Sequence, residues 1–334
     1  MQSYTFRICT LLICLSFSFL YAGGQTVQLV NSGTKTSVRG LCVVNDEVIW
    51  ASGSNGMIAR SVDSGKTWKW SQVKGFEKTD FRDIEAFNSK TALTMGITLP
   101  AVILRTTDGG ENWKEVYMDS SKEIFLDAME FWNEESGIIL GDPIDNHFLI
   151  LRTLDGGRSW FRSSHTPVAD SGEACFASSG TNIRKFNKRE ALFVSGGSGA
   201  HLFLRDKKIL LPLLQGKEST GANSIAIKNN KIFIIAGGDF ANKDSITGNC
   251  TITRDAGKSW IKPENPPSGY RSCIEYISGK SWITCGLNGV DYSTDDGLKF
   301  IPVSPESYHV CRRAKKGKAV FLAGGGGRIA KFIY

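Results

Sequence analysis

The chain has 334 residues, of which 41% are hydrophobic and 22% charged, and its formal net charge is +7 at pH 7. This apolar fraction is typical of a globular protein and excludes a disordered or collagen-like chain. The sequence contains no block of five or more basic residues, so we expect no nucleic-acid partner. An excess of Gly (36) over Pro (9) favours many short turns, as in sheet-rich proteins.

The first segment has the layout of a secretory signal peptide. Arg7 precedes a largely apolar run from Ile8 to Leu20, which is followed by the small residue Ala22. We expect cleavage after Ala22, which makes residues 1–22 the signal peptide and residues 23–334 one secreted or periplasmic domain. The apolar run is shorter than the roughly 20 residues of a membrane span, so we expect no stable membrane insertion after cleavage.

Six cysteines follow the predicted cleavage site, and in an exported chain they permit disulfides in several pairings, with buried free thiols as the alternative. They are Cys42, Cys175, Cys250, Cys273, Cys285 and Cys311. None stands in a C-x-x-C pair, and the four His residues show no metal-ligand spacing. We therefore expect neither a metal nor a cofactor.

A pattern of the form S/T-x-D-x-G-x-x-W/F recurs five times along the chain. Its aspartates are Asp63, Asp108, Asp155, Asp255 and Asp295, and its aromatic residues are Trp68, Trp113, Trp160, Trp260 and Phe300. The aspartates are 45, 47, 100 and 40 residues apart, and the long gap holds a degenerate copy near Asp206. A period of about 40 to 50 residues with several strands each is typical of a β-propeller blade.

The residue types of this motif fit a turn better than a catalytic or metal site. The Asp carboxylate can accept backbone N–H groups of its own turn, and Gly supplies a positive φ. The aromatic side chain can fold back and bury a large apolar area between sheets. We expect a structural device that ties together the outer strands of a blade.

Strand-like runs around the motifs predict seven blades. The runs expected next to the central channel are Arg39–Val44, Phe81–Phe87, Phe125–Trp132, Ala174–Ser178, Asn223–Ile227, Arg271–Tyr276 and Tyr308–Arg312. The last repeat lacks a fourth strand, which Thr26–Val30 can supply, and this pairing would remove an exposed sheet edge. The sequence thus predicts an all-β, monomeric, seven-bladed β-propeller closed by its N- and C-terminal strands.

Charged side chains on the channel strands indicate a polar channel. Alignment of these strands places Arg39, Arg82 and Arg271 at one equivalent position, with Asn223 in the fifth blade. Three guanidinium groups could converge on an anionic ligand or an acidic partner surface. The alternative is that each arginine pairs with a neighbouring acid and fills the channel. The candidate binding residues are Arg39, Arg82, Arg271, Asn223, Arg312, Glu173 and Asp83.

The five motif copies resemble the Asp-box (BNR) repeats of sialidases and related propellers. The seven-fold count, the export signal and the phrase Ala323-Gly-Gly-Gly-Gly-Arg-Ile-Ala330 are similar to the photosystem II stability/assembly factor family and its non-photosynthetic bacterial relatives. This resemblance implies a non-catalytic scaffold whose arginine-bearing face contacts a partner protein. Arg39, Arg82 and Arg271 are the residues that could have this role, because of their positions in the blades.

Two other function classes fit the fold. A sialidase-type or other glycoside hydrolase would need a nucleophile pair, for which Tyr270 or Tyr276 could supply the tyrosine. Glu275 or Glu173 could supply the carboxylate. Sialidases are six-bladed, however, and their Arg-Ile-Pro motif is absent here. A cell-surface module that binds an anionic glycan is the third class. We expect the non-catalytic scaffold with a protein partner.

Overall fold

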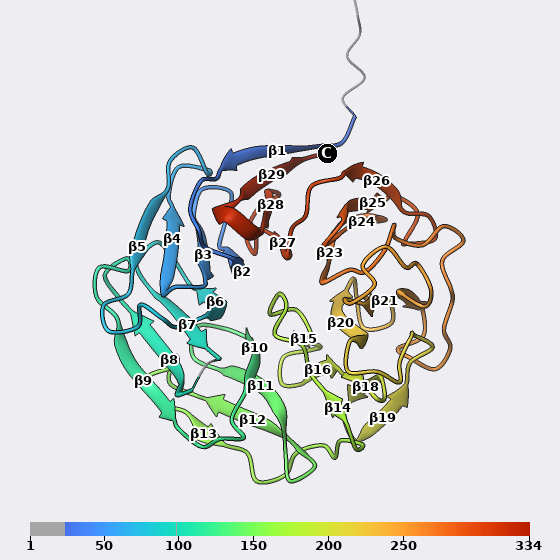
Figure 1. The fold of residues 1–334 in the computed structure, drawn as a ribbon, viewed down its shortest axis with the longest axis horizontal. Coiled ribbons are helices and arrows are strands. Elements are labelled where there is room, and N and C mark those ends of the chain that lie inside the picture. The colour runs from blue at the N-terminus through green and yellow to red at the C-terminus, as the bar shows by residue number, and fades with distance from the viewer. Residues whose placement is uncertain (1–23, 98) are drawn as a thin grey trace, which may run out of the picture.

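The computed structural model describes residues 24–97 and 99–334, which form a ring of sheets around a central axis (Figure 1). The predicted signal peptide lies outside the described residues. Seven sheets succeed one another around the ring, so the predicted all-β, seven-bladed propeller is confirmed. The one helix of the described residues is a short 3-10 turn, Gly325–Gly327, and none could cross a membrane.

Four blades are regular four-stranded meanders that run from the channel outward. The first contains β2 (Val38–Val43), β3 (Ile49–Gly53), β4 (Met57–Ser61) and β5 (Lys69–Gln72). The second contains β6 (Phe81–Ala86), β7 (Ala92–Gly96), β8 (Ala101–Thr106) and β9 (Lys114–Asp119). The third contains β10 (Leu126–Phe131), β11 (Gly137–Ile144), β12 (His147–Thr153) and β13 (Phe161–Arg162). The sixth contains β23 (Cys273–Ser278), β24 (Ser281–Gly286), β25 (Gly289–Ser293) and β26 (Ile301–Ser304).

The seventh blade joins the two ends of the described chain, as the sequence predicts. It contains β27 (Val310–Arg313), β28 (Val320–Ala323), β29 (Ile329–Ile333) and β1 (Thr26–Asn31). Strand β1 pairs antiparallel with β29, with Thr26 opposite Ile333 and Leu29 opposite Ala330. The two ends therefore lie side by side at the rim (Figure 1), and the pairing covers an edge that would otherwise be free to pair with another chain.

The fourth and fifth blades depart from the predicted pattern. The fourth contains β15 (Ile183–Lys185), β16 (Ala191–Val194), β18 (His201–Leu204) and β19 (Lys207–Leu210). The sheet of the fifth contains β20 (Thr220–Ile227), β21 (Phe233–Asp239) and β22 (Cys250–Thr253), extended by β14 (Glu173–Ala174) and β17 (Gly196–Gly197). The predicted channel strand at 174–178 is therefore wrong. Residues 175–182, rich in small hydroxyl side chains, form a loop that we call the channel loop.

The five motif turns share one set of hydrogen bonds, and we call them Asp turns. In the third copy, the Thr153 hydroxyl donates to the Asp155 carboxylate (2.8 Å), and the Gly157 amide donates to the Thr153 hydroxyl (2.9 Å). The amide of Ser159 donates to the same carboxylate (3.0 Å). The other four copies repeat these bonds. Each carboxylate is thus engaged inside its own turn.

Each Asp turn also packs on the preceding blade, which is more than the tie within one blade that the sequence predicts. A Cβ atom on Gly157 would come within 2.2 Å of the buried side chain of Leu93, in β7 of the second blade. Trp113 meets Trp50 of the first blade edge-on, with ring centroids 6.4 Å apart. The Asp turns therefore hold successive blades together through dispersion contacts and apolar burial.

All six cysteines after the predicted cleavage site are buried free thiols. Two of them, Cys273 and Cys311, lie on neighbouring channel strands with their sulfur atoms 3.6 Å apart. The alternative of buried thiols thus holds for these residues, and among the described residues the fold is held without a disulfide.

Substitution of Gly157 by Ala tests the contact between blades. We expect a loss of about 2 to 4 kcal/mol in the free energy of unfolding, because a Cβ strains the positive φ of 73° and also displaces Leu93. Gly75→Ala is the matched control, since Gly75 has a φ of 85° but no atom within 4 Å of its added Cβ. We expect about 1 to 2 kcal/mol there. Equal losses in urea denaturation would contradict the contact.

The Asp turns predict a loss of stability in acid. Hydrogen bonds from Ser259 and Thr253 lower the pKa of Asp255 from 3.8 to about 2. Because the folded pKa is below the unfolded one, the stabilisation is present above pH 3.8 and is lost as the pH falls toward 2. Thermal melts against pH should therefore show a shallower acid decline for Asp255→Asn than for the wild type. Asp206→Asn, in the turn without the motif, should leave the decline unchanged.

Candidate functional site

The channel loop, residues 175–182, lies near the axis of the ring (Figure 1). It crosses the channel, because it contacts the first two blades through Arg39 and Arg82 and the opposite side through Asn223 and Ser272. The Ser179 hydroxyl donates to the backbone carbonyl of Ser272 (2.7 Å), and the Thr181 hydroxyl donates to the hydroxyl of Ser224 (2.6 Å). Ser179 and Thr181 are each at most 1% exposed. The loop therefore supplies partners for polar groups on the fifth and sixth blades that burial would otherwise leave unsatisfied, and it separates two channel mouths.

The first mouth, which we call the arginine mouth, is a cavity of about 440 Å³ where the inner strands begin. Arg39 and Arg82 both line it, and each donates from Nη1 to a carbonyl of the channel loop. Arg39 contacts the carbonyl of Ser178 at 3.3 Å, and Arg82 contacts that of Ala177 at 3.0 Å. Two of the three predicted arginines are thus brought together on one loop.

Only one of the two arginines at the arginine mouth forms an ion pair with an acidic residue. Arg82 pairs with Asp80 at 2.7 Å, whereas Arg39 has no ion pair among the described residues. Burial, and then the neighbouring Arg82, lower the pKa of Arg39. Burial and the nearby Asp142 raise the pKa of Asp127 well above its usual range, and no described residue bonds either of its carboxyl oxygens. Arg39 is therefore the guanidinium group of this mouth that lacks an ion-pair partner in the described part of the chain, and the carboxyl group of Asp142, whose pKa burial raises to about 6, lines the same cavity.

Arg271 does not join this pair. It is fully buried, and its Nε donates to Asp291 at 2.6 Å while its Nη1 donates to the carbonyl of Tyr270 at 2.8 Å. The channel side is occupied instead by Tyr270, whose hydroxyl donates to Asn223 (2.8 Å). Arg271 precedes β23, and its side chain contacts Asp291 of β25 and Asn288 in the turn before it. Arg271 thus forms an ion pair with a neighbouring acid, which was the alternative to ligand binding.

Glu173 lies away from the arginines, in a cluster with Lys208 and His201. Its carboxylate accepts from Lys208 at 2.8 Å and from His201 at 2.9 Å. Although burial raises it, hydrogen bonds from His201, Lys208 and Ser195 lower the pKa of Glu173 to about 2. Asp170, Glu173 and His201 are close enough to ligate a cation. The Lys208 ammonium already lies against both carboxylates, however, and satisfies them without one.

The tyrosines and glutamates that a sialidase-type site would need do not bond one another. Tyr270 lines the arginine mouth, while Glu275 lines the opposite end of the channel and pairs with Arg184 at 3.0 Å. Tyr276 lines the same end as Glu275, but its hydroxyl donates to the carbonyl of Gly279 (3.4 Å). Among the described residues, no hydrogen bond joins Tyr270 or Tyr276 to Glu173 or Glu275.

Arg312 and Asp83 belong to the part of the channel beyond the channel loop. Asp83 accepts from the backbone amides of Ile84 and Met129, each at 2.8 Å. Burial, opposed by Arg312, raises the pKa of Asp83 to about 7. Arg312 lines the second mouth together with Arg184 and Lys315, which were not among the predicted binding residues. Arg184 follows a stretch without strand character, so the alignment of channel strands could not place it.

These features define a class: a seven-bladed propeller built on Asp turns, with a channel closed by a loop and bordered by arginines. A family model described as "Photosynthesis system II assembly factor YCF48" matches residues 70–168. The resemblance to this assembly-factor family is therefore confirmed, over that part of the chain. No curated protein matches the chain.

Solved structures of propellers match nearly the whole chain. A structure of "YCF48 bound to D1 peptide" is 13% identical, with a TM-score of 0.65 over 92% of this chain and 95% of that one. YCF48 from Cyanidioschyzon merolae is 15% identical, with a TM-score of 0.65 over 92% and 98%. The WD40 propeller domain of Doa1 is 12% identical, with a TM-score of 0.61 over 93% and 97%. These likenesses establish a shared fold.

Paired substitutions separate the structural Arg271 from Arg39, which lines the arginine mouth. Arg271→Met should cost about 3 to 5 kcal/mol in the free energy of unfolding, because it leaves Asp291 buried without its partner. Arg39→Met removes one hydrogen bond to a loop carbonyl and should cost about 1 kcal/mol. Urea denaturation followed by circular dichroism measures both. An Arg271 variant as stable as the Arg39 variant would refute the structural role of Arg271.

Proposed function

We propose that the protein is an exported, non-catalytic scaffold that binds an acidic segment of a protein partner at the arginine mouth. The observation that carries this proposal is the position of Arg39 and Arg82, two guanidinium groups held on one loop at the edge of a cavity. Arginine forks recognise carboxylates through paired, charge-assisted hydrogen bonds. A segment with Asp or Glu side chains would supply the missing negative charge.

Apolar side chains beside the arginines favour a protein ligand. Phe125, Phe176 and Phe240 line the same cavity, and Phe240 is 43% exposed. Phe176 and Phe240 meet edge-on, with ring centroids 5.8 Å apart. Aromatic residues and arginine are the types enriched at the centres of protein interfaces. The expected ligand therefore combines an acidic side chain with an apolar neighbour.

Two further observations support the proposal. A similar propeller, YCF48, has been solved with a peptide of D1 bound, which is a protein ligand on the same fold. The sequence of residues 1–22 has the layout of an export signal, so we place the protein in the periplasm or outside the cell, where it would meet its partner. An anionic glycan is the alternative ligand for the same charges.

A phage-displayed library of random peptides tests the proposal on the purified protein. We expect enrichment of peptides with Asp or Glu next to an aromatic or aliphatic residue. Arg39→Gln and Arg82→Gln should each weaken the selected peptide about tenfold or more, because each removes charge-assisted bonds. Arg205→Gln is the control, since Arg205 is 60% exposed and pairs with Glu190 outside the channel.

Three results would contradict the proposal. Selection of peptides without acidic residues would show that the arginines do not recognise a carboxylate of the ligand. Peptides that bind both arginine variants as tightly as the wild type would place the site elsewhere. Turnover of a fluorogenic sialoside, lost in Glu173→Gln or Glu275→Gln, would make the protein a glycoside hydrolase.

A further inference from the structure

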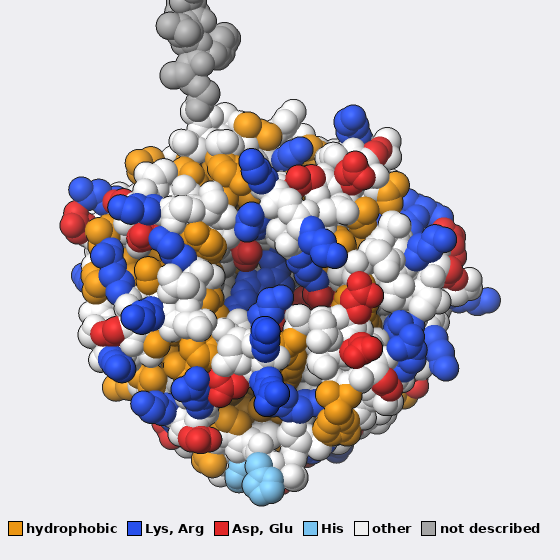
Figure 2. Space-filling view, turned by 180° about the vertical axis from the view of Figure 1, so that it is seen from behind, with side chains coloured by type: hydrophobic (Ala, Val, Ile, Leu, Met, Phe, Trp, Pro, Cys, Tyr) orange, Lys and Arg blue, Asp and Glu red, His pale blue; other side chains and the backbone are white. Residues whose placement is uncertain are grey.

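A second cavity, of about 300 Å³, lies at the other end of the channel, where the inner strands end. We call it the Arg312 pocket. Figure 2 shows the face opposite to that of Figure 1, with a hollow at its centre in and around which blue Lys and Arg side chains gather. The hollow would hold about ten water molecules, or a small organic molecule. The channel loop separates it from the arginine mouth, so its chemistry is independent of the function proposed above.

Basic side chains outnumber acidic ones around this pocket. The basic ones are Arg184, Lys185, Arg312, Arg313 and Lys315. The acidic ones are Glu85, Glu130 and Glu275. With every group ionised, the lining carries an excess of two positive charges. A concave site with such an excess attracts anions.

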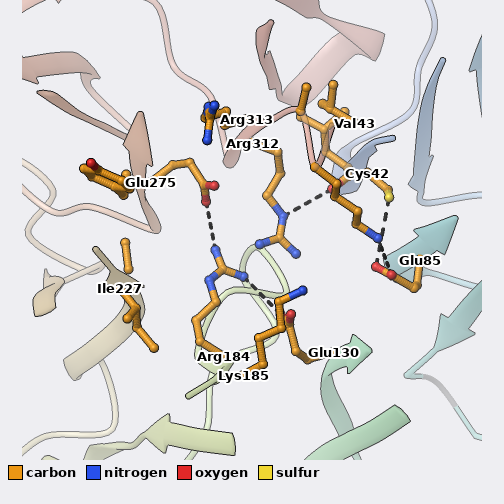
Figure 3. A pocket seen from close by; sticks show the side chains of 15 residues that line it. Cys42, Val43, Glu85, Glu130, Arg184, Lys185, Ile227, Glu275, Arg312 and Arg313 are labelled. Carbon is orange, nitrogen blue, oxygen red and sulfur yellow. Dashed lines mark hydrogen bonds and ion pairs between the residues drawn. The ribbon is translucent and has the colours of Figure 1, made fainter. Parts of the chain in front are cut away.

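The three glutamates form ion pairs with only two of the basic side chains. Arg184 pairs with Glu275 at 3.0 Å and approaches Glu130 at 3.6 Å. Lys315 pairs with Glu85. These contacts hold the side chains in fixed positions at the wall of the pocket (Figure 3). They leave Arg312 without an acidic partner.

Arg312 is the unsatisfied cation of the pocket. Its Nε donates to the carbonyl of Leu41 at 3.3 Å, and no described residue accepts from its two terminal nitrogens. Figure 3 shows this guanidinium group pointing into the middle of the pocket, above Lys185 and Glu130. Glu275, Asp83 and Glu130 outweigh the effect of burial and raise the pKa of Arg312, which therefore stays charged.

Arg184 is a second, largely buried cation at this pocket. It is 8% exposed, and its Nη1 faces a carboxylate oxygen of Glu130 at 3.6 Å, just beyond hydrogen-bond distance. Buried donors without a partner are rare in folded proteins, because each one forfeits its hydration. The terminal nitrogens of Arg312, which have no acceptor among the described residues, therefore indicate a small planar acceptor in this cavity.

We propose that the Arg312 pocket binds a carboxylate group, carried by a small organic acid or by the C-terminus of a peptide. The two terminal nitrogens of Arg312 donate to its two oxygens, in the bidentate geometry that guanidinium and carboxylate groups share. The ammonium of Lys185, which lines the same pocket, adds a further positive charge. The three glutamates at the wall disfavour anions of higher charge, such as inorganic phosphate.

Calorimetric titration of the full chain tests the proposal with defined probes. The probes are propionate, acetylated trialanine with a free C-terminus, the same peptide with an amidated C-terminus, and inorganic phosphate. We expect binding of at least one free carboxylate probe, and weaker binding of the amide and of phosphate. Propionate alone would identify the ligand as a small acid, and the free peptide alone would identify it as a chain terminus.

Substitutions then locate the binding site. Arg312→Gln should weaken the carboxylate probe about tenfold or more, and Lys185→Gln about threefold. Lys185 is exposed, so its variant should fold even where Arg312→Gln does not. Arg205→Gln, at an exposed pair outside the channel, should bind like the wild type. The proposal is overturned if no carboxylate probe binds, if phosphate binds as tightly, or if Lys185→Gln retains the wild-type affinity.

Discussion

The contact of each Asp turn with the preceding blade is the constraint on which the rest of the molecule depends. A blade of three or four short strands cannot bury both of its faces alone. The Asp turn solves this locally: its carboxylate and hydroxyl groups fix the backbone, so that a Gly can approach the neighbouring blade closely and an aromatic side chain can cover it. Repetition of this contact, together with the pairing of β1 and β29, closes the ring.

Closure of the ring creates a second demand, because the inner strands face a narrow channel with polar side chains. Serine, asparagine and aspartate residues there are almost fully buried and need partners. The channel loop supplies many of them, and it receives hydrogen bonds from Arg39 and Arg82 in return. Because the loop fills the middle of the channel, the two ends become separate sites. The arginine mouth has arginines beside aromatic rings, and the Arg312 pocket has an arginine that forms no ion pair among the described residues.

The sequence was informative where the chemistry is local and repeated. The Asp turns depend on residues at most a few positions apart, so their spacing predicted the blades and the closing strand. The channel loop depends on distant partners: Ser178 bonds Asn223, 45 residues away, and no local pattern indicates this. Arg271 failed to join Arg39 and Arg82 for another reason. Strand β23 begins at Cys273, and a small change in register sends a side chain to the other face of a sheet.

Hydrogen exchange of residues 178–182 tests the central claim most directly, namely that the channel loop is a fixed part of the ring. The account predicts that the amides of this segment exchange as slowly as those of the channel strand β6, because the segment is buried and the hydroxyls of Ser179 and Thr181 anchor it to the fifth and sixth blades. Exchange as fast as that of the exposed segment 241–247 would contradict it. The channel would then be open from end to end, and its two mouths would be one site.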